Sequence, residues 1–259
     1  MRANKWLFGI TLACAVYFGL GALDLIYFRF YFFGRILVFS MAYPAELAIL
    51  IFFWDKASKE IGKMGGKLCW CKNESLIRNS NYAETYYRRW GKIIIGVPFI
   101  LLFLISLKFG YKSALFIAST AYFTDMGGHF FGQNILRAYF PNYKPHILFS
   151  EVNGDKSYEA MILSIILTNV LCNTIGMILF TPKFITSPAQ GVLPVFLGSI
   201  GGVIGDIAES QFKRLTDVKD SSEALGSHGG FLDRIDSLIG TIITYVVYLF
   251  AFLLYIYGR

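Results

Sequence analysis

Residues 237–258 read SLIGTIITYVVYLFAFLLYIYG, a run of twenty-two residues without one charged side chain. A helix needs about 20 apolar residues to cross the roughly 30 Å hydrocarbon core of a bilayer. The run is therefore long enough to span a membrane. Lipid cannot hydrogen-bond the open edge of a sheet, so the expected backbone structure is a helix.

The composition of the whole chain agrees with a membrane protein. Of the 259 residues, 55% are apolar and 16% are charged, whereas a soluble domain carries about 25% charged residues. Four cysteines are too few for a disulfide-rich secreted scaffold, and the chain is too apolar to be disordered. We predict an all-α polytopic integral membrane protein, with about seven to eight transmembrane helices and cytoplasmic catalytic loops.

Seven apolar segments are expected to cross the membrane. They cover residues 6–28, 31–54, 93–110, 112–124, 159–181, 185–210 and 237–258. The first is long enough to remain as a span rather than to be cleaved as a signal peptide. We divide this single membrane domain into N-terminal helices at 1–110 and a C-terminal catalytic region at 111–259.

The distribution of charge predicts the topology. A polar stretch at 55–92, interpreted as a loop, holds nine Lys or Arg residues against four Asp or Glu residues. Positive residues near span ends remain in the cytoplasm, where they also contact anionic lipid headgroups. Counting spans from this loop places 125–158 and 211–236 on the cytoplasmic side as well. All three large polar stretches would then share one face.

Charged residues gather where the segment 185–210 ends. Asp206, Glu209, Ser210, Lys213 and Arg214 are spaced by three, four, seven and eight residues, so they lie on one face of a helix. One interpretation is an interfacial helix end with internal i,i+4 salt bridges. Ionisable residues at membrane depth are, however, functional candidates, and we favour a functional site.

The following loop is also rich in charges and in glycine. Its candidate residues are Lys219, Asp220, His228, Gly229, Gly230, Asp233, Arg234 and Asp236. A helix N-cap would explain one of the aspartates. Glycines let a backbone approach a phosphate closely, and helix N-termini attract anions. Several aspartates beside several cations indicate a divalent-cation site that holds phosphates.

These residues resemble the signature of the phosphatidate cytidylyltransferases, also called CDP-diacylglycerol synthases. The matching positions are Gly205-Asp206, Glu209-Ser210, Lys213-Arg214, Lys219-Asp220, His228-Gly229-Gly230, Asp233-Arg234 and Asp236. Upstream, Asp125, Gly127, Phe131 and Gly132 are similar to a second family stretch. A third family stretch aligns with 153–160, where Lys156 and Glu159 are kept, Ser157 replaces Thr, and a Ser, a Pro and a Gly are lost. The resemblance covers about residues 120–259.

The resemblance implies that CTP and phosphatidic acid react to give CDP-diacylglycerol and pyrophosphate, a step of phospholipid biosynthesis. A phosphate monoester has a second pKa of about 6, so phosphatidate is already a nucleophile at neutral pH. Positioning and cations then supply most of the catalysis. The implied cofactor is Mg²⁺, with room for a second cation. Its expected ligands are Asp206 and Asp233, followed by Asp236, Glu209 and Asp125.

Other residues receive substrate-related roles by the same resemblance. Lys219, Asp220, His228 and Arg234 are expected to take part in the chemistry, together with Asp206 and Asp233. The expected substrate-binding residues are Lys156, Ser157, Ser210, Lys213, Arg214, Gly229 and Gly230. Arginine suits a two-pronged phosphate contact, whereas lysine acts as a point charge.

Two other functions are compatible with the sequence. A CTP-dependent kinase of a membrane prenol or dolichol would also use CTP, but it would transfer the γ-phosphate. An ion or solute transporter could use Asp206 as a midplane site, although the ionisable residues cluster in and beside loops. The expected partners are CTP, phosphatidic acid and the lipid bilayer, with no nucleic acid, and a homodimer is compatible with the sequence. We expect a multi-pass protein of the bacterial inner (plasma) membrane whose site faces the cytoplasm.

Overall fold

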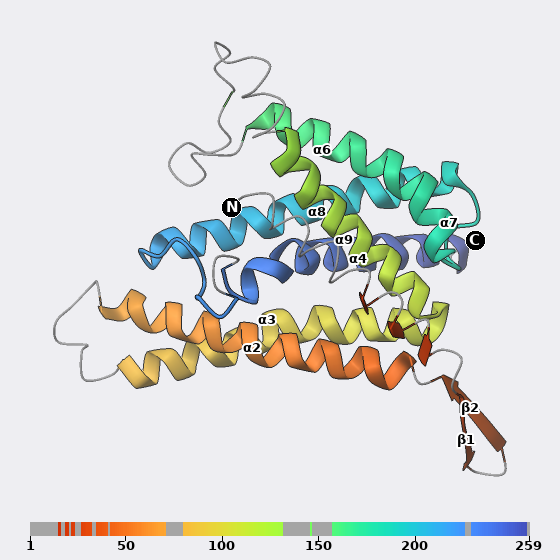
Figure 1. Ribbon diagram of the computed structural model, residues 1–259, viewed down its shortest axis with the longest axis horizontal. Coiled ribbons are helices and arrows are strands. Elements are labelled where there is room, and N and C mark those ends of the chain that lie inside the picture. Colours follow the sequence, from red (N-terminus) through yellow and green to blue (C-terminus); the bar gives the residue numbers. More distant parts are fainter. Residues whose placement is uncertain are drawn as a thin grey trace.

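The computed structural model describes residues 15–16, 19–20, 22–23, 27–32, 35–40, 42–70, 80–131, 146, 157–225 and 229–257. Apart from one hairpin and the turns and loops that connect the elements, this part of the chain is helical (Figure 1). The elements are β1 (Tyr27–Phe32), β2 (Arg35–Ser40), α2 (Ala42–Trp70), α3 (Ser80–Phe109), α4 (Tyr111–His129), α6 (Tyr158–Leu171), the π-helix η3 (Cys172–Gly176), α7 (Met177–Phe180), α8 (Pro188–Leu215) and α9 (Leu232–Tyr257).

Four helical segments in the described ranges are long and apolar enough to cross a bilayer. They are Tyr82–Phe109, Tyr158–Phe180, Pro188–Leu215 and Leu232–Tyr255. Large apolar side chains on α3, including Ile93, Val97 and Leu104, are about half exposed. Such a surface would be costly in water, but it suits contact with lipid chains. The protein is thus an integral membrane protein, and four of the seven predicted spans correspond to these segments.

The predicted span at 31–54 is wrong as a single helix. Its first part holds the end of β1 and all of β2, and these strands form an antiparallel hairpin whose register joins Tyr27 to Ser40 and Phe32 to Arg35. The helix begins only at Ala42. Aromatic residues make up five of the six residues of β1, and aromatic or β-branched residues make up half of β2; such residues favour strands over helices. The predicted segment 112–124 lies within α4, which is not among the four candidate spans, and most of 6–28 lies outside the described residues.

The interpretation of 55–92 as a loop is also wrong. Helix α2 continues to Trp70 and α3 begins at Ser80, so most of this basic stretch is helical. The two helices pack side by side, and the indole Nε1 of Trp54 donates a hydrogen bond to the Lys92 carbonyl at 2.7 Å. Each helix can bury one face against the other helix while its charged side chains lie on the opposite face. A strongly basic segment can therefore remain helical beyond the apolar part of the same helix.

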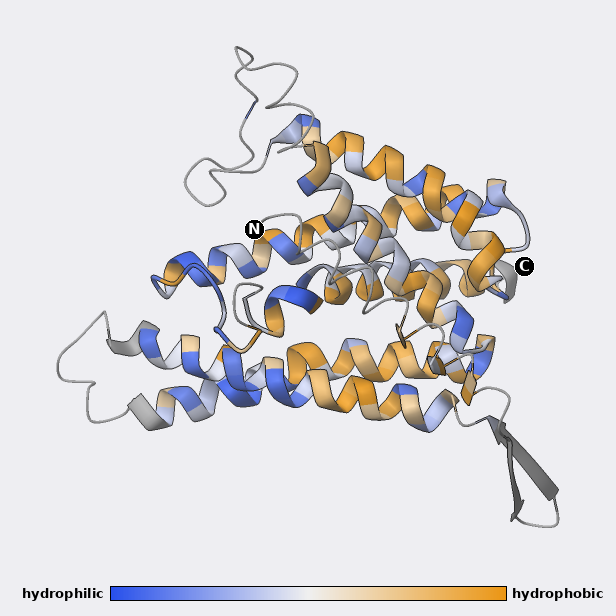
Figure 2. Ribbon diagram, in the orientation of Figure 1, coloured by the Kyte–Doolittle hydropathy of each residue, from blue (hydrophilic) through white to orange (hydrophobic). Residues whose placement is uncertain are grey.

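The polar ends of the helices lie together. In Figure 1 the C-terminal ends of α2, α4 and α8 and the N-terminal ends of α3, α6 and α9 lie toward the same end of the molecule. Figure 2 shows hydrophilic residues gathered at this end of α2, α3, α8 and α9, with hydrophobic residues along the rest of these helices. The helix ends that flank the three polar stretches thus lie at one end of the molecule, which is consistent with the prediction that these stretches share one face.

Helices α8 and α9 approach closely because glycines face each other at their crossing. A Cβ atom on Gly240 would collide with the Gly201 carbonyl, and one on Gly205 would collide with the Asp236 carbonyl. The hydroxyl of Thr241 donates to the Gly198 carbonyl at 3.0 Å. Small residues allow this backbone approach in membrane helices. The crossing sets the end of α8 against the beginning of α9.

Candidate active site

A lysine between two carboxylates joins α8 to α9. The Lys213 Nζ atom lies 2.5 Å from Oε2 of Glu209 and 2.9 Å from Oδ1 of Asp233. Glu209 is only 7% exposed, and the other two side chains are half-buried. Charged hydrogen bonds of this kind are among the stronger ones in proteins, and buried charges need such pairing. The structure confirms the i,i+4 pairing on α8 and extends it to α9.

Asp233 also organises the chain just before α9. Its Oδ2 atom accepts hydrogen bonds from the Gly230 N–H at 2.6 Å and the Ser221 N–H at 3.1 Å. The Ser221 hydroxyl lies 3.1 Å from the same atom. Asp233 is therefore an acid in the first turn of α9, as a favourable helix-dipole contact requires, but it is not the N-cap, because the N–H groups that it accepts from precede the helix; it also contacts Lys213.

A carboxylate from α2 that the sequence analysis did not select enters the same region. Glu60 is 5% exposed. Its Oε1 atom accepts from the Ser222 hydroxyl at 2.6 Å and the Phe231 N–H at 3.0 Å. Its Oε2 atom accepts from the Ser221 hydroxyl at 2.9 Å and the Leu232 N–H at 2.7 Å. Each carboxylate oxygen thus binds one hydroxyl and one backbone N–H.

The position of Glu60 within its helix is the signal that could have revealed it. Ala57 and Met64, three and four residues away, are buried, so Glu60 belongs to the stripe that faces the core. Asp55 on the same helix is partly exposed, with 43% of its side chain accessible, and it pairs with Lys59 at 2.5 Å. That hydrogen bond lowers the pKa of the Asp55 carboxyl. An acid in an apolar stripe, unlike one on a charged face, indicates a specific buried partner.

The two glycines of the predicted phosphate-binding turn have structural roles. Gly229 has a φ of 78°, which favours glycine, and a Cβ atom there would contact the Asp233 carboxylate. A Cβ atom on Gly230 would collide with the Ser221 hydroxyl and the Glu60 carboxylate. Internal packing thus accounts for both glycines, and their contact with a phosphate stays a prediction.

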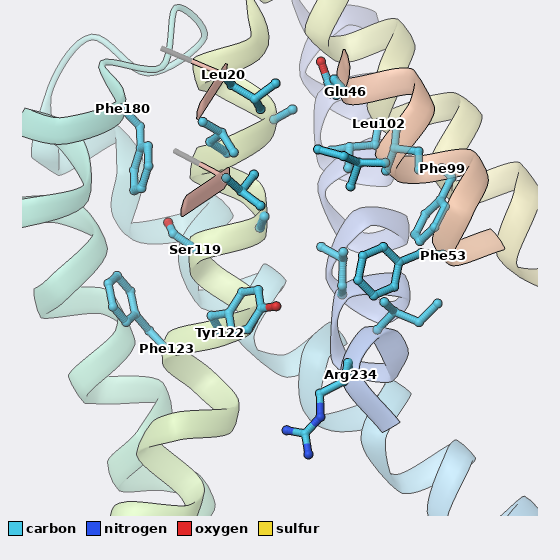
Figure 3. A pocket seen from close by; sticks show the side chains of 18 residues that line it. Leu20, Glu46, Phe53, Phe99, Leu102, Ser119, Tyr122, Phe123, Phe180 and Arg234 are labelled. Atoms are coloured by element: carbon cyan, nitrogen blue, oxygen red, sulfur yellow. The ribbon is translucent and has the colours of Figure 1, made fainter. Parts of the chain in front are cut away.

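Two hollows flank the beginning of α9. A groove of about 860 Å³ lies between α3, α8 and α9; Tyr87 and Trp90 line it, and so do Glu209 and Asp236. A cavity of about 230 Å³ lies between α2, α3, α4 and α9, with Arg234 at one end of an otherwise largely apolar lining (Figure 3). Residues two apart on a helix point to nearly opposite sides, which places Asp236 and Arg234 in different hollows.

The remaining predicted site residues have varied surroundings. Asp206 and Ser210 are half-buried on α8. Four charged residues are exposed, namely Asp125 at the end of α4 and Arg214, Lys219 and Asp220 at and beyond the end of α8. The Ser157 hydroxyl accepts from the Ala160 N–H at 3.3 Å, so this serine caps α6. Lys156 and His228 lie outside the described residues.

Comparison with known proteins places this arrangement in a family. The model of the Cytidylyltransferase family matches residues 3–252. The chain belongs to this family. The phosphatidate cytidylyltransferase of Helicobacter pylori strain J99 is 31% identical over 144 residues, which are 56% of this chain and 49% of that protein.

Other relatives of this cytidylyltransferase family member carry the same name. The phosphatidate cytidylyltransferase of Bacillus subtilis is 30% identical over 132 residues, covering 51% of this chain and 45% of that protein. That of Pseudomonas aeruginosa is 51% identical over 49 residues, covering 19% and 18%. The chain thus matches about half the length, or less, of these relatives.

The donor set of this cytidylyltransferase family member suits a cation that arrives with phosphates. Among the described residues, no three His, Cys, Asp or Glu side chains form a group that could hold a metal ion. The Oε1 atom of Glu209 is nevertheless buried, and no described donor reaches it. Mg²⁺ commonly binds one or two carboxylates together with substrate phosphates. Glu209 and Asp233 fit that requirement, with Asp206 one helical turn before Glu209.

Proposed function

We propose that this protein is a CTP:phosphatidate cytidylyltransferase, which makes CDP-diacylglycerol and pyrophosphate from CTP and phosphatidic acid. The observation that carries the proposal is the buried Glu209–Lys213–Asp233 group at the polar end of apolar helices. Charged groups that can bind phosphates there lie beside an apolar groove. A lipid could reach such a site from the bilayer while a nucleotide reaches it from water. The relatives' names support the same activity.

The chain's own residues would mainly position the two anionic substrates. An oxygen of phosphatidate forms a new bond to the α-phosphorus of CTP, and the bond to the departing pyrophosphate breaks. Because the phosphate monoester is largely dianionic at neutral pH, no strong base is needed. Arg214 in the last turn of α8 and Lys219 beyond its end are exposed, and there they can attract the triphosphate from water. Lys213 would hold phosphate oxygens at the buried end of the site.

A Mg²⁺ ion is part of the proposal. Glu209 and Asp233 would hold it, with Asp206, Asp236 and Asp125 as further candidate ligands. When bound, the ion would offset the negative charge on the departing pyrophosphate. The buried and unsatisfied Oε1 atom of Glu209 supports this assignment.

The membrane orientation follows from the same chemistry. We place the shared polar end of the helices in the cytoplasm, because CTP is a cytoplasmic nucleotide, the hydrophilic parts of α2 and α3 lie at this end (Figure 2), and these parts are rich in lysine and arginine. The proposed setting is a bacterial inner (plasma) membrane, which the protein crosses several times. A homodimer stays a prediction.

One assay separates the proposed activity from the alternatives. The purified protein is given Mg²⁺, phosphatidate in mixed micelles and CTP labelled in its cytidine. We expect the label to move into the organic phase and pyrophosphate to appear in equal amount. A prenol or dolichol kinase would leave the label in water as CDP, and a transporter would not consume CTP. Either of these results would refute the proposal.

A further inference from the structure

We propose that Glu60 is a positioning residue for the reaction, because it fixes the start of α9 and the serine turn that together hold Asp233. The inference rests on the proposed function for its kinetic part. Glu60 belongs to α2, and 161 to 172 residues separate it in sequence from its four partners. A contact between such distant segments orders the site only once the chain has folded.

The backbone contacts of Glu60 replace a helix cap. The first N–H groups of a helix lack partners within the helix. Here the N–H groups of Phe231 and Leu232 donate to opposite oxygens of the Glu60 carboxylate, at 3.0 and 2.7 Å. A negative charge is also favourable at a helix N-terminus. The cap of α9 is therefore supplied partly by another helix, which ties α2 to the beginning of α9.

The serine contacts connect Glu60 to Asp233. The Ser221 hydroxyl lies 2.9 Å from Oε2 of Glu60 and 3.1 Å from Oδ2 of Asp233. A hydroxyl has one proton, so Ser221 can fully donate to only one of these carboxylates at a time. Glu60 thus competes for a donor of Asp233, and it also holds the turn whose Ser221 N–H reaches Asp233.

Glu60 acts through these neighbours rather than on the substrate. Both of its oxygens already accept two hydrogen bonds, and the side chain is buried. Glu209, by contrast, has a buried oxygen that no described donor reaches. The substrate and the cation are therefore expected at Glu209 and Asp233, while Glu60 determines where Asp233 lies.

The substitution Glu60→Gln tests this role with almost no change of shape. Each oxygen of Glu60 faces one backbone N–H, and a backbone N–H cannot accept a hydrogen bond. Whichever way the introduced amide turns, its NH₂ group faces one of these donors. Glu84→Gln on the neighbouring helix α3 is the matched control, because Glu84 is exposed. Both variants lose one negative charge.

Two measurements are made on the full-length protein in detergent. Hydrogen exchange of peptides that cover residues 219–233 should be faster in Glu60→Gln than in the wild type, and unchanged in Glu84→Gln. At a temperature where both variants are folded by size exclusion, kcat of Glu60→Gln should fall about tenfold or more, as expected when a buried donor loses its acceptor. The KM values should change by less than about threefold, because the contacts to substrate remain.

The outcomes separate this proposal from the proposed function. Unchanged exchange at 219–233, or a kcat per folded protein close to that of Glu84→Gln, would overturn the role of Glu60. If Glu60→Gln does not fold, Ser222→Ala is tested instead, because it removes one of the four hydrogen bonds of Glu60. Faster exchange and a lower kcat in Ser222→Ala would support the positioning role of Glu60, and no change in either would overturn it. If the wild type makes no CDP-lipid, the proposed function fails, and the exchange result alone decides whether Glu60 fixes the start of α9.

Discussion

Asp233 combines two tasks in one carboxylate. It accepts hydrogen bonds from the turn before α9, and it pairs with Lys213 across the α8–α9 contact. The same group is a proposed ligand of Mg²⁺. Single-residue changes at this site must therefore be judged by activity and folding together, because loss of the contacts to the turn and loss of a metal ligand would both reduce activity.

Removing the charge of Asp233, a proposed metal ligand, or of Asp206, a further candidate ligand, should nearly abolish activity. We expect Asp233→Asn and Asp206→Asn each to remove most CDP-lipid synthesis while the protein stays monodisperse in detergent. Asparagine keeps the shape of aspartate but lacks the charge that holds a divalent cation. The check is the initial rate with saturating Mg²⁺. Activity within about tenfold of the wild type, or about 1.4 kcal/mol of barrier, in both variants would show that they are not the ligands.

Arg234 should need its guanidinium rather than only its charge. It lies at one end of the apolar cavity beside the first turn of α9 (Figure 3). Arg234→Lys is expected to lower the rate substantially, because an ammonium cannot make a two-pronged phosphate contact. The rate of Arg234→Lys is compared with that of a double variant in which both Lys63 and Lys67 are replaced. These two lysines are exposed on α2 and act by diffuse charge that salt screens. A larger loss in the double variant would place the site on α2 and α3 instead.

At the scale of elements, the α8–α9 pair holds the site together. Glycines at the crossing let the two backbones touch, and this contact sets Lys213 opposite Asp233. The apolar groove runs along the same pair toward Glu209 and Asp236. Because packed helices respond to added volume by shifting, a small change at the crossing should also displace the residues at the polar end of the two helices.

Adding a methyl group at the crossing should destabilise the protein. Gly240→Ala places a Cβ atom against the Gly201 carbonyl, and overpacking of this kind costs about 1–3 kcal/mol. The expected result is a lower thermal midpoint in detergent and a lower activity. Gly128→Ala on α4 is the control, because a Cβ atom there meets nothing within 4 Å. Equal thermal midpoints for the two variants would argue against a tight glycine crossing.

At the scale of the whole molecule, the helices share one polar end (Figure 2). The polar end of the α2–α3 pair supplies Glu60, and the α8–α9 pair supplies Lys213 and Asp233, so both pairs contribute to one site. A site at a membrane surface needs this arrangement, because one substrate is a lipid and the other is a water-soluble nucleotide. Polar residues gathered at one end of otherwise apolar helices provide it.

The shared polar end predicts a specific topology. Reporters placed after Lys72 and after Lys219 should both lie in the cytoplasm, because α2 and α8 end on the same side of the molecule (Figure 1) and the end of α2 and the beginning of α3 are rich in lysine and arginine. A reporter after Arg259 should lie on the opposite side, since α9 is long and apolar enough to cross the membrane once. Reporters after Lys72 and Lys219 on opposite sides would contradict both the shared end and the single site.

The sequence alone determined the membrane class, the positions of the most apolar helices and the charged motif from Asp206 to Asp236. These features depend on local composition and spacing, which a helix preserves whatever it packs against. Only the tertiary structure decided that 55–92 is mostly helix and that Lys213, which pairs with Glu209 on its own helix, also reaches Asp233 on α9; the strand Arg35–Ser40 agrees with local residue preferences that the sequence analysis did not weigh. It also decided the role of Glu60, whose partners lie more than 160 residues away. Contacts between distant segments arise from the packing of whole helices, and no local pattern of residues encodes them.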